Sequence, residues 1–372
     1  MASLCKEFDF KDIYSLYLIL GRDCNMSCRH CTQAPFKKPP LLCTLSSDVD
    51  KLLDNFIKWS LSINSSQQHI IKFYGGEALL YWDLIKSIVT KYSIKYNILS
   101  SSKFRFVIMS NGLLLNHEIV DFCNQYGIRF ILSYDAPNPF FVRGFIGDSV
   151  INNFLKINDR VIRTGFSSKN CDFYEAYLFL KNKFPNTNID FSFDLILTHF
   201  MPKDIYNFDF DVVSNNFKKL RIAIKLGKSD VLKKFVLGIL LPIKYSNLNS
   251  FFLNHNIKPC FSGKYHLSVM LDGSIVSCHN SSLVVGNVHD SLSDIFNASY
   301  SYYKQHSCSF CLTCLNRDIC HGGCCLSLKD TDGQYLSCKL YRNKIFSLFK
   351  EEMSKLAYDL TDDEIQWFNQ CN

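Results

Sequence analysis

The chain has 372 residues, a net charge of +7 and 17 cysteines, and 47% of its residues are apolar. A chain this long and rich in core residues does not need disulfide staples. It has no Lys/Arg run of the kind that nucleic-acid footprints need and no apolar stretch long enough to cross a bilayer, so we expect neither nucleic acid nor membrane as a partner. The first ten residues include Glu7 and Asp9 and lack the apolar centre of a signal peptide, which predicts a cytoplasmic protein. In the reducing cytosol, clustered cysteines are typical of metal sites.

Strand-like and helix-like segments alternate through the first half of the chain. The predicted strands are Ile13–Leu20, His69–Tyr74, Phe104–Met109, Ile128–Ser133, Val161–Phe166 and Ile189–Leu197. The clearest helical patterns are Asp48–Leu61, Leu80–Lys95, Asn116–Tyr126 and Asp172–Phe184. This alternation predicts an α/β fold with a parallel sheet and right-handed crossovers. About six such units favour a partial (β/α)6 TIM-type barrel over a closed barrel of eight strands.

The composition and hydrophobic pattern of the sequence change after the predicted barrel. Phe217–Leu241 is helical and basic, and cysteines and glycines dominate between Cys260 and Cys338. Leu340–Phe368 has the pattern of an amphipathic helix with a break near Thr361. We therefore expect a barrel over residues 1–200, a helical bridge over 201–258, a small cysteine-rich domain over 259–340 and a C-terminal helix over 341–372.

Three cysteines directly follow the first predicted strand. Cys24, Cys28 and Cys31 form C-x3-C-x2-C, which can hold three irons of a [4Fe–4S] cube and leave the fourth iron open. A zinc knuckle is the alternative that this spacing leaves open. Because sites in barrels of this kind form at the carboxyl ends of the strands, the position of the triplet favours a functional cluster.

Polar and glycine-rich residues also follow the next three predicted strands. These residues are Gly75, Gly76 and Glu77, then Ser110 and Asn111, then Ser133 and Asp135. Since parallel strands end at one edge of a sheet, all of them are expected at the same rim as the cysteine triplet.

The cysteine triplet and the Gly-Gly-Glu motif together resemble the radical S-adenosylmethionine (SAM) superfamily, over residues 14 to about 200. The resemblance implies that the three cysteines bind a [4Fe–4S] cluster whose open iron chelates SAM. It also implies reductive cleavage of SAM to a 5′-deoxyadenosyl radical, which abstracts hydrogen from a substrate.

The resemblance assigns SAM contacts by position. Gly75, Gly76 and Glu77 match the motif that binds the SAM amino group, where we expect bare backbone to admit the ligand. Ser110 and Asn111 match a strand end near SAM.

Two further contacts follow from the same resemblance. Ser133 and Asp135 match a usual source of ribose contacts, and Arg143 matches an arginine that binds the SAM carboxylate in peptide-modifying members. His30 departs from the family pattern, because a large aromatic residue usually precedes the third cysteine.

Seven further cysteines occur in a fixed order, and their generic interpretation is two zinc or iron–sulfur sites. The order resembles the SPASM domain of radical SAM peptide maturases, which binds two auxiliary [4Fe–4S] clusters. The resemblance places Cys311, Cys314, Cys320 and Cys338 on the distal cluster and Cys260, Cys278 and Cys324 on the nearer one. For the fourth position of the nearer cluster, an open iron, His255 and Cys308 remain equal alternatives.

These features predict a radical SAM enzyme that modifies a ribosomal peptide, with a side-chain cross-link (carbon–carbon, ether or thioether) as the leading reaction. Oxidation of Cys or Ser to formylglycine, as in sulfatase-maturating enzymes, is an alternative, although His279 follows Cys278 where those enzymes commonly have an aspartate. Dehydrogenation of a small metabolite is another alternative. A non-catalytic electron-transfer protein is disfavoured, because a carrier has no use for a SAM site.

The expected partners are a peptide substrate and a reductant such as flavodoxin or ferredoxin. About a dozen residues precede the first predicted strand, so we expect a separate leader-recognition protein, or the barrel and bridge themselves, to read a peptide leader. The sequence identifies no catalytic acid or base. The proton-carrier candidates by location are Tyr134, Asp194, His199, His266 and His279.

Overall fold

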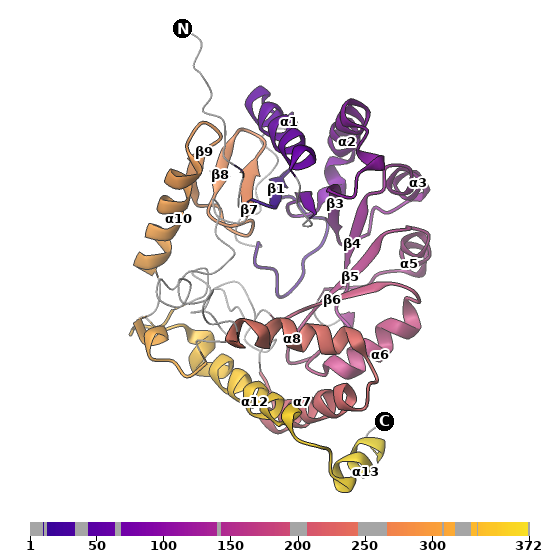
Figure 1. Cartoon of the computed structure of the whole chain (residues 1–372), viewed down its shortest axis with the longest axis vertical. Helices are drawn as coiled ribbons and strands as arrows, with labels where there is room; N and C mark the ends of the chain where they lie inside the picture. Colours follow the sequence, from indigo (N-terminus) through magenta and orange to yellow (C-terminus); the bar gives the residue numbers. More distant parts are fainter. Residues whose placement is uncertain are drawn as a thin grey trace.

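A computed structural model describes residues 10, 13–33, 44–63, 68–139, 143–193, 207–244, 266–306, 309–316, 329–332 and 334–370. Its strands form one curved sheet with helices along the outer side (Figure 1). None of the helices in these ranges combines the length and the apolarity that a membrane crossing requires.

The sheet has nine strands in the order β6-β5-β4-β3-β2-β1-β7-β8-β9. The strands are β1 (Ser15–Ile19), β2 (His69–Tyr74), β3 (Phe104–Ser110), β4 (Arg129–Ser133), β5 (Arg160–Gly165), β6 (Asn188–Ser192), β7 (His266–Met270), β8 (Ser274–Val276) and β9 (Val284–Asn287). Strands β1 to β6 are parallel and lie in chain order, which confirms the α/β partial barrel. Strand β7 pairs parallel with β1, and β8 and β9 continue antiparallel. The cysteine-rich region therefore extends the barrel sheet.

Helices follow the strands along the outside of the curve. They are α1 (Ser47–Ser62), α2 (Trp82–Tyr96), α3 (His117–Gln125), α5 (Asp148–Leu155), α6 (Phe173–Lys183), α7 (Phe210–Lys225), α8 (Asp230–Lys244), α10 (Leu292–His306), α12 (Asn343–Ser354) and α13 (Asp362–Gln370). Side-chain caps explain several of the starts, because Ser46 accepts from the Val49 N–H, Asn116 from Ile119 and Asp172 from Tyr174.

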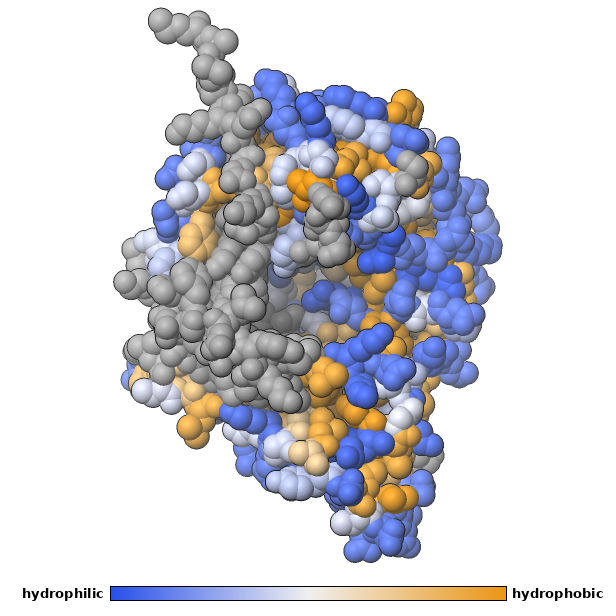
Figure 2. Space-filling view, in the orientation of Figure 1, coloured by the Kyte–Doolittle hydropathy of each residue, from blue (hydrophilic) through white to orange (hydrophobic). Residues whose placement is uncertain are grey.

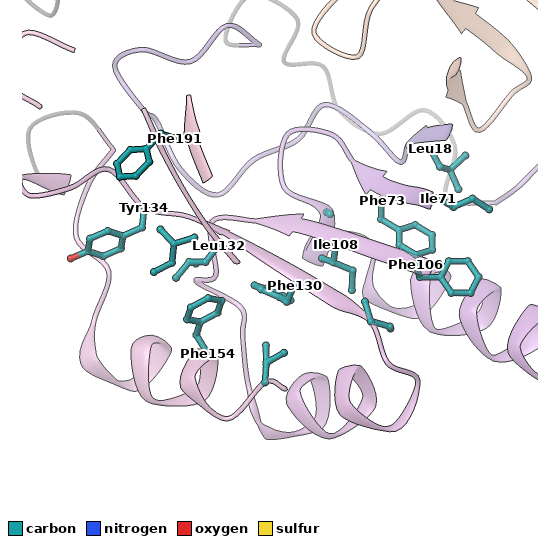
Figure 3. Close-up of a cluster of buried hydrophobic side chains, with 14 of the residues drawn as sticks. Leu18, Ile71, Phe73, Phe106, Ile108, Phe130, Leu132, Tyr134, Phe154 and Phe191 are labelled. Atoms are coloured by element: carbon teal, nitrogen blue, oxygen red, sulfur yellow. The ribbon is translucent and has the colours of Figure 1, made fainter. Parts of the chain in front are cut away.

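The main hydrophobic core lies between the outer face of the sheet and these helices (Figure 3). Alternate residues of each strand point into it, as a two-residue period requires, so Phe73, Phe106 and Phe130 are at most 1% exposed. Tyr134 also belongs to this core, where it packs on Phe179 and Phe184. We expected Tyr134 among the proton-carrier candidates, and this packing removes it from them.

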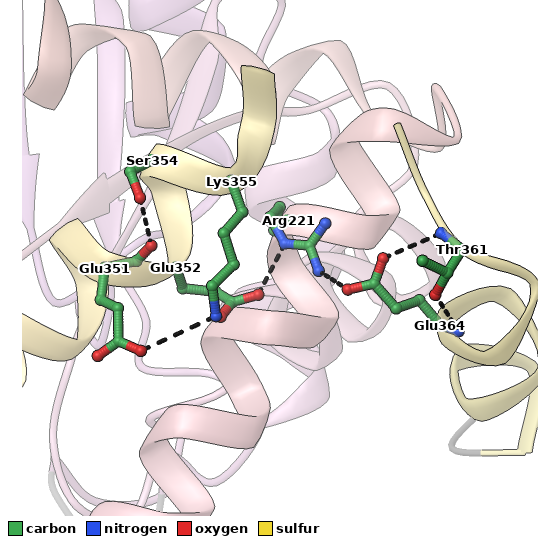
Figure 4. Close-up of polar contacts among 7 residues, drawn as sticks. All are labelled: Arg221, Glu351, Glu352, Ser354, Lys355, Thr361 and Glu364. Carbon is green, nitrogen blue, oxygen red and sulfur yellow. Dashed lines mark hydrogen bonds and ion pairs between the residues drawn. The ribbon is translucent and has the colours of Figure 1, made fainter. Parts of the chain in front are cut away.

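The C-terminal helices pack on α7 rather than forming a separate unit. The buried Arg221 of α7 donates to Glu352 of α12 and to Glu364 of α13 (Figure 4). The break that we expected near Thr361 is present between α12 and α13. The single helical pattern over 217–241 is two helices, because the chain turns at Gly227, whose φ of +67° favours glycine.

Candidate functional site

The three cysteines of the first group lie on the loop that leaves β1, at the carboxyl end of the parallel sheet. All three are partly exposed. Nitrogen donors point at two of the sulfurs: Asn111 Nδ2 lies 3.8 Å from Cys24 Sγ, and Arg143 Nη1 lies 3.8 Å from Cys28 Sγ. Burial raises the pKa of the Cys28 thiol to about 11, while Arg143 acts in the opposite direction. Donors around a sulfur stabilise the thiolate that binds a metal.

The Gly-Gly-Glu motif at the end of β2 binds this loop through its backbone N–H groups. Gly76 N donates to Gly21 O at 3.0 Å, and Glu77 N donates to Asp23 O at 2.7 Å. A Cβ on Gly75 would lie 2.3 Å from Gly21 O, and one on Gly76 would lie 2.2 Å from Asp23 O. A side chain at either position would collide with the cysteine loop, and the expectation that the bare backbone also admits a ligand stays a prediction. The glycines therefore position that loop.

Glu77 is buried and binds the end of β3. Its Oε1 accepts from Ser110 Oγ at 2.6 Å and from Leu79 N at 2.9 Å, and its Oε2 accepts from Asn111 N at 2.8 Å. Burial raises the pKa of the Glu77 carboxyl, and these hydrogen bonds partly oppose that shift. Because Oε2 accepts only one of these bonds, it keeps a lone pair for a further donor such as an ammonium. Asn111 also donates to Asn25 Oδ1 at 2.8 Å, a contact that motif reasoning did not reveal.

The buried Asp135 and the partly buried Arg143 and His30 form a charged group at the end of β4. Asp135 Oδ2 accepts from Arg143 Nε at 3.1 Å and lies 3.5 Å from His30 Nε2, while Oδ1 accepts from Gly165 N at 2.9 Å. Burial acts to raise the pKa of Asp135, but Arg143 and His30 hold it below its ordinary value. Arg143 Nη2 also lies 3.3 Å from His30 Nε2. His30 thus joins the group that surrounds the Cys28 sulfur.

Ser133 is the last residue of β4, partly buried, and pairs in register with Arg163 of β5. The structure therefore brings all eight predicted SAM-contact residues to the same rim as the first cysteine triplet, as expected from parallel strands.

The donor set fits an iron–sulfur cube better than a single ion. No three His, Cys, Asp or Glu side chains within the described ranges converge closely enough to hold one metal ion. A cube presents separate irons to separate thiolates, so three cysteines on one loop can ligate it without meeting at a point.

A loop of the cysteine-rich region lies against the inner face of the barrel. It follows β8, begins at Cys278 and places the His279 ring on Tyr17 of β1, with a centroid distance of 4.5 Å and an interplanar angle of 7°. Asn280 Oδ1 accepts from Tyr74 Oη at 2.9 Å and from Gln33 Nε2 at 3.1 Å.

The buried Arg22, two residues before Cys24, fixes the same loop. It donates to the His279 carbonyl at 3.0 Å and to that of Ser281. Arg22 and Gln33 flank the first cysteine triplet, so the cysteine groups around Cys24 and Cys278 are joined by direct hydrogen bonds.

Two described cysteines of the second group, Cys314 and Cys338, lie near the start of α12. Cys314 Sγ lies 3.5 Å from Asn343 Oδ1, and Cys338 begins the π-helical turn that runs into this helix. Cys311 is in the short 3-10 turn Ser309–Leu312. Several predicted residues lie outside the described ranges, namely Cys260, Cys320, Cys324, His255, Cys308, Asp194 and His199.

Lys72 was missed by motif reasoning. It is buried on the inner face of β2, next to the Tyr17–His279 stack. The signal in the sequence was a single charged residue within the otherwise apolar strand from Ile70 to Tyr74. The face shown in Figure 2 is hollowed at its centre, and hydrophilic side chains lie beside the hollow.

Comparisons with known families match two parts of the chain. The model of the radical SAM superfamily matches residues 18–174. A model of an iron–sulfur cluster-binding domain, SPASM, matches residues 260–321. Together the matches include the first cysteine triplet, the rim residues and most of the second cysteine group.

Individual proteins are similar over most of the chain. The radical SAM cyclopropyl synthase TigE from Paramaledivibacter caminithermalis is 22% identical and aligns with 95% of this chain and 78% of its own length. The structure of anSMEcpe with bound AdoMet superposes with a TM-score of 0.59 at 18% identity, over 93% of this chain and all of that one. Streptococcus suis SuiB bound to its precursor peptide SuiA superposes with a TM-score of 0.56 at 17% identity, over 88% of this chain and 76% of that one. At these identities the structures support the fold.

Proposed function

Because this chain is a radical SAM enzyme with a SPASM iron–sulfur domain, we propose that it matures a ribosomal peptide by forming a side-chain cross-link. The bond is carbon–carbon, ether or thioether. When bound, SAM and the [4Fe–4S] clusters supply a 5′-deoxyadenosyl radical that abstracts hydrogen and an acceptor for the electron left on the substrate. A cross-link removes two hydrogen atoms from the peptide, so both capacities are needed.

The observation that carries the proposal is the contact between the two cysteine groups. Arg22 binds the carbonyls of the loop that begins at Cys278, and Tyr74 binds Asn280 of the same loop. A substrate inside the barrel would therefore lie between the first cluster at the rim and an auxiliary cluster beside the inner face. That arrangement suits an oxidation in which hydrogen leaves on one side and an electron on the other.

The roles of the rim residues belong to the same proposal. Cys24, Cys28 and Cys31 hold the SAM cluster, and Glu77 receives the SAM ammonium on its remaining lone pair, in the cradle made by Ser110 and Asn111. Arg143, oriented by Asp135, would bind the SAM carboxylate, and Ser133 would contact the ribose.

The cysteine-rich region holds the auxiliary clusters in this proposal. Cys311, Cys314, Cys320 and Cys338 ligate the distal cluster, and Cys260, Cys278 and Cys324 ligate the nearer one. The domain boundaries given from sequence are part of the proposal, as is a cytosolic setting that keeps these thiols reduced.

Two relatives support a peptide substrate and bond formation. SuiB was solved with its precursor peptide, and TigE is described as a cyclopropyl synthase, a name that implies closure of a carbon ring. A small reductant protein and, for the leader, a separate recognition protein complete the proposed partners.

The test is mass spectrometry on a short peptide encoded beside this gene, co-expressed with the enzyme under anaerobic conditions. We expect loss of the mass of two hydrogens per modification, with fragmentation blocked between the two joined residues. The Cys24→Ala variant should leave the peptide unmodified. An unchanged peptide mass with the wild-type enzyme, and no solvent deuterium incorporated, would contradict peptide maturation. Conversion of one Cys or Ser to an aldehyde would instead establish the formylglycine alternative.

A further inference from the structure

Lys72 lies on the inner face of β2, within the barrel. Its neighbours Ile71 and Phe73 point into the outer core, so the two-residue period turns Lys72 the other way. It is 8% exposed, and its strand partner in register is Tyr17 of β1. A buried lysine is uncommon unless it is paired with an anion.

Lys72 has no such anion among the residues that the structure describes. Its Nζ donates to Tyr17 Oη at 3.4 Å and lies 4.8 Å from the centre of the same ring. Within the described parts of the chain, no carboxylate lies within the 4.0 Å of Nζ that an ion pair requires. Burial, together with the charges of Arg163 and Arg129, lowers the pKa of Lys72 to about 8, and Asp190 acts in the opposite direction.

Two described aspartates near this inner wall, Asp190 and Asp159, are already engaged. Asp190 pairs with Arg163 at 3.2 Å, and Asp159 pairs with Arg129 at 3.0 Å and also with Arg105. The wall therefore has an excess of positive charge centred on Lys72.

Lys72 lies below the rim, at a depth where a substrate inside the barrel could reach it. It comes three residues before Gly75, which places it about 10 Å below the rim at roughly 3.3 Å per strand residue. Tyr17, which it contacts, stacks on His279 of the loop that begins at Cys278. A molecule held at Lys72 would thus lie below the SAM rim and beside an auxiliary cysteine.

We propose that Lys72, with Tyr17 Oη as a second donor, binds a carboxylate of the substrate. The carboxylate is an Asp or Glu side chain, or the C-terminus, close to the carbon that reacts. A carboxylate fits better than a phosphate, because Lys72 supplies a single ammonium beside the Tyr17 hydroxyl while the neighbouring guanidiniums are already paired. This inference rests on the proposed function, since it takes the substrate to be a peptide.

The test uses the reconstituted holoenzyme and the peptide described above, with each Asp and Glu replaced in turn by Asn or Gln and the C-terminus amidated in a separate peptide. The enzyme variants are Lys72→Met and Lys72→Glu. Lys86→Met is the matched control, because Lys86 lies on the outer surface and pairs with Glu118 at 2.8 Å. Iron content and the thermal midpoint report whether each variant is folded and loaded.

We expect Lys72→Met to raise KM for the native peptide at least roughly 30-fold, as loss of a buried charge partner does. One peptide that lacks a carboxylate should show the same rise with the wild-type enzyme and no further rise with Lys72→Met. Placing a Lys at that peptide position should restore turnover by Lys72→Glu. Lys86→Met should change neither value.

An unchanged KM in Lys72→Met, or an equal loss with every peptide, would overturn the inference while peptide maturation stands. Failure of the wild-type enzyme to modify any of these peptides would instead overturn the proposed function.

Discussion

The two faces of the barrel sheet differ sharply although they share the same strands. On the outer face, Phe73, Phe106 and Phe130 pack in a continuous apolar layer against the helices. On the inner face, Lys72 adjoins Phe73 along β2, and Arg163 adjoins the buried Ile162 along β5. Because neighbouring residues of one strand point to opposite sides, residues that stabilise the core alternate with residues that face the interior of the barrel. Variants on the outer face should therefore lower the stability of the fold, whereas variants on the inner face should alter its charge and its binding of substrate.

The largest effect on stability is expected on the outer face. Phe130→Ala removes a ring that is 0% exposed and packs on Phe154, so it should lower the free energy of unfolding by roughly 3–5 kcal/mol. Phe145→Ala is the matched control, because the same atoms are removed from a side chain that is 75% exposed; its effect should stay within about 0.5 kcal/mol. Denaturant midpoints of the anaerobically purified enzymes measure both. Equal shifts would contradict the assignment of the core to this face.

The next effect tests the rim. Asp135→Asn leaves the partly buried Arg143 guanidinium without its charged hydrogen-bond partner, which should cost about 2–3 kcal/mol. Asp190→Asn, which breaks the more exposed pair with Arg163, should cost less than about 1 kcal/mol.

The Asp135 effect should depend on pH. The folded pKa of Asp135 lies below its unfolded value, so its contribution is complete above the unfolded pKa of about 4 and is lost as the pH falls through the folded pKa. Midpoints measured from pH 7 down to pH 3 should therefore show a constant gap between Asp135→Asn and the wild type above about pH 4 and a narrowing gap below it. A constant gap across this range would show that the aspartate acts through shape instead of charge.

On the inner face, one variant should gain stability. Lys72→Met should stabilise the enzyme by roughly 1–3 kcal/mol at pH 7, because a buried lysine without an anion is costly in its charged form. The folded pKa of about 8 lies below the unfolded one of about 10.4, so the unfolded chain binds the proton more tightly. Wild-type stability should therefore rise between these values, and the advantage of Lys72→Met should vanish near pH 10. A destabilised Lys72→Met enzyme at pH 7 would show that Lys72 serves the fold.

The smallest effect concerns the contact between the two cysteine groups. Arg22→Lys keeps the charge but cannot reach both carbonyls, so it should cost about 1–2 kcal/mol through one unpaired buried acceptor. The electron paramagnetic resonance signal of an auxiliary cluster should shift, because Cys278 adjoins His279, whose carbonyl Arg22 holds. An unchanged signal with an unchanged midpoint would show that the two groups are independent.

The strands were predictable because their signals are local. β2 was predicted at its observed bounds, since its apolar run ends at Gly75. Helix α5 was missed: it is only eight residues long and begins after Gly147 with no side-chain cap. The pairing of β7 with β1 could not be predicted either, because it joins segments about 250 residues apart and no local pattern in either segment identifies its partner.

The site was predictable to the level of its rim. Parallel strands end at one edge, so the companions of the cysteine triplet could be placed there before any contact was known. The roles within the rim needed coordinates, because only they show that Gly75 and Gly76 seat the cysteine loop and that Asp135 binds Arg143. Lys72 could have been identified from its charge within an apolar strand, but its lack of an anionic partner among the described residues could not.

The central claim is that the rim holds a cluster that cleaves SAM. The most direct measurement is 5′-deoxyadenosine formed from SAM by the anaerobically reconstituted, chemically reduced enzyme, with Cys24→Ala as the control. The account predicts 5′-deoxyadenosine from the wild-type enzyme and none from Cys24→Ala. No product from a wild-type enzyme with its full iron complement, or equal product from both proteins, would contradict it.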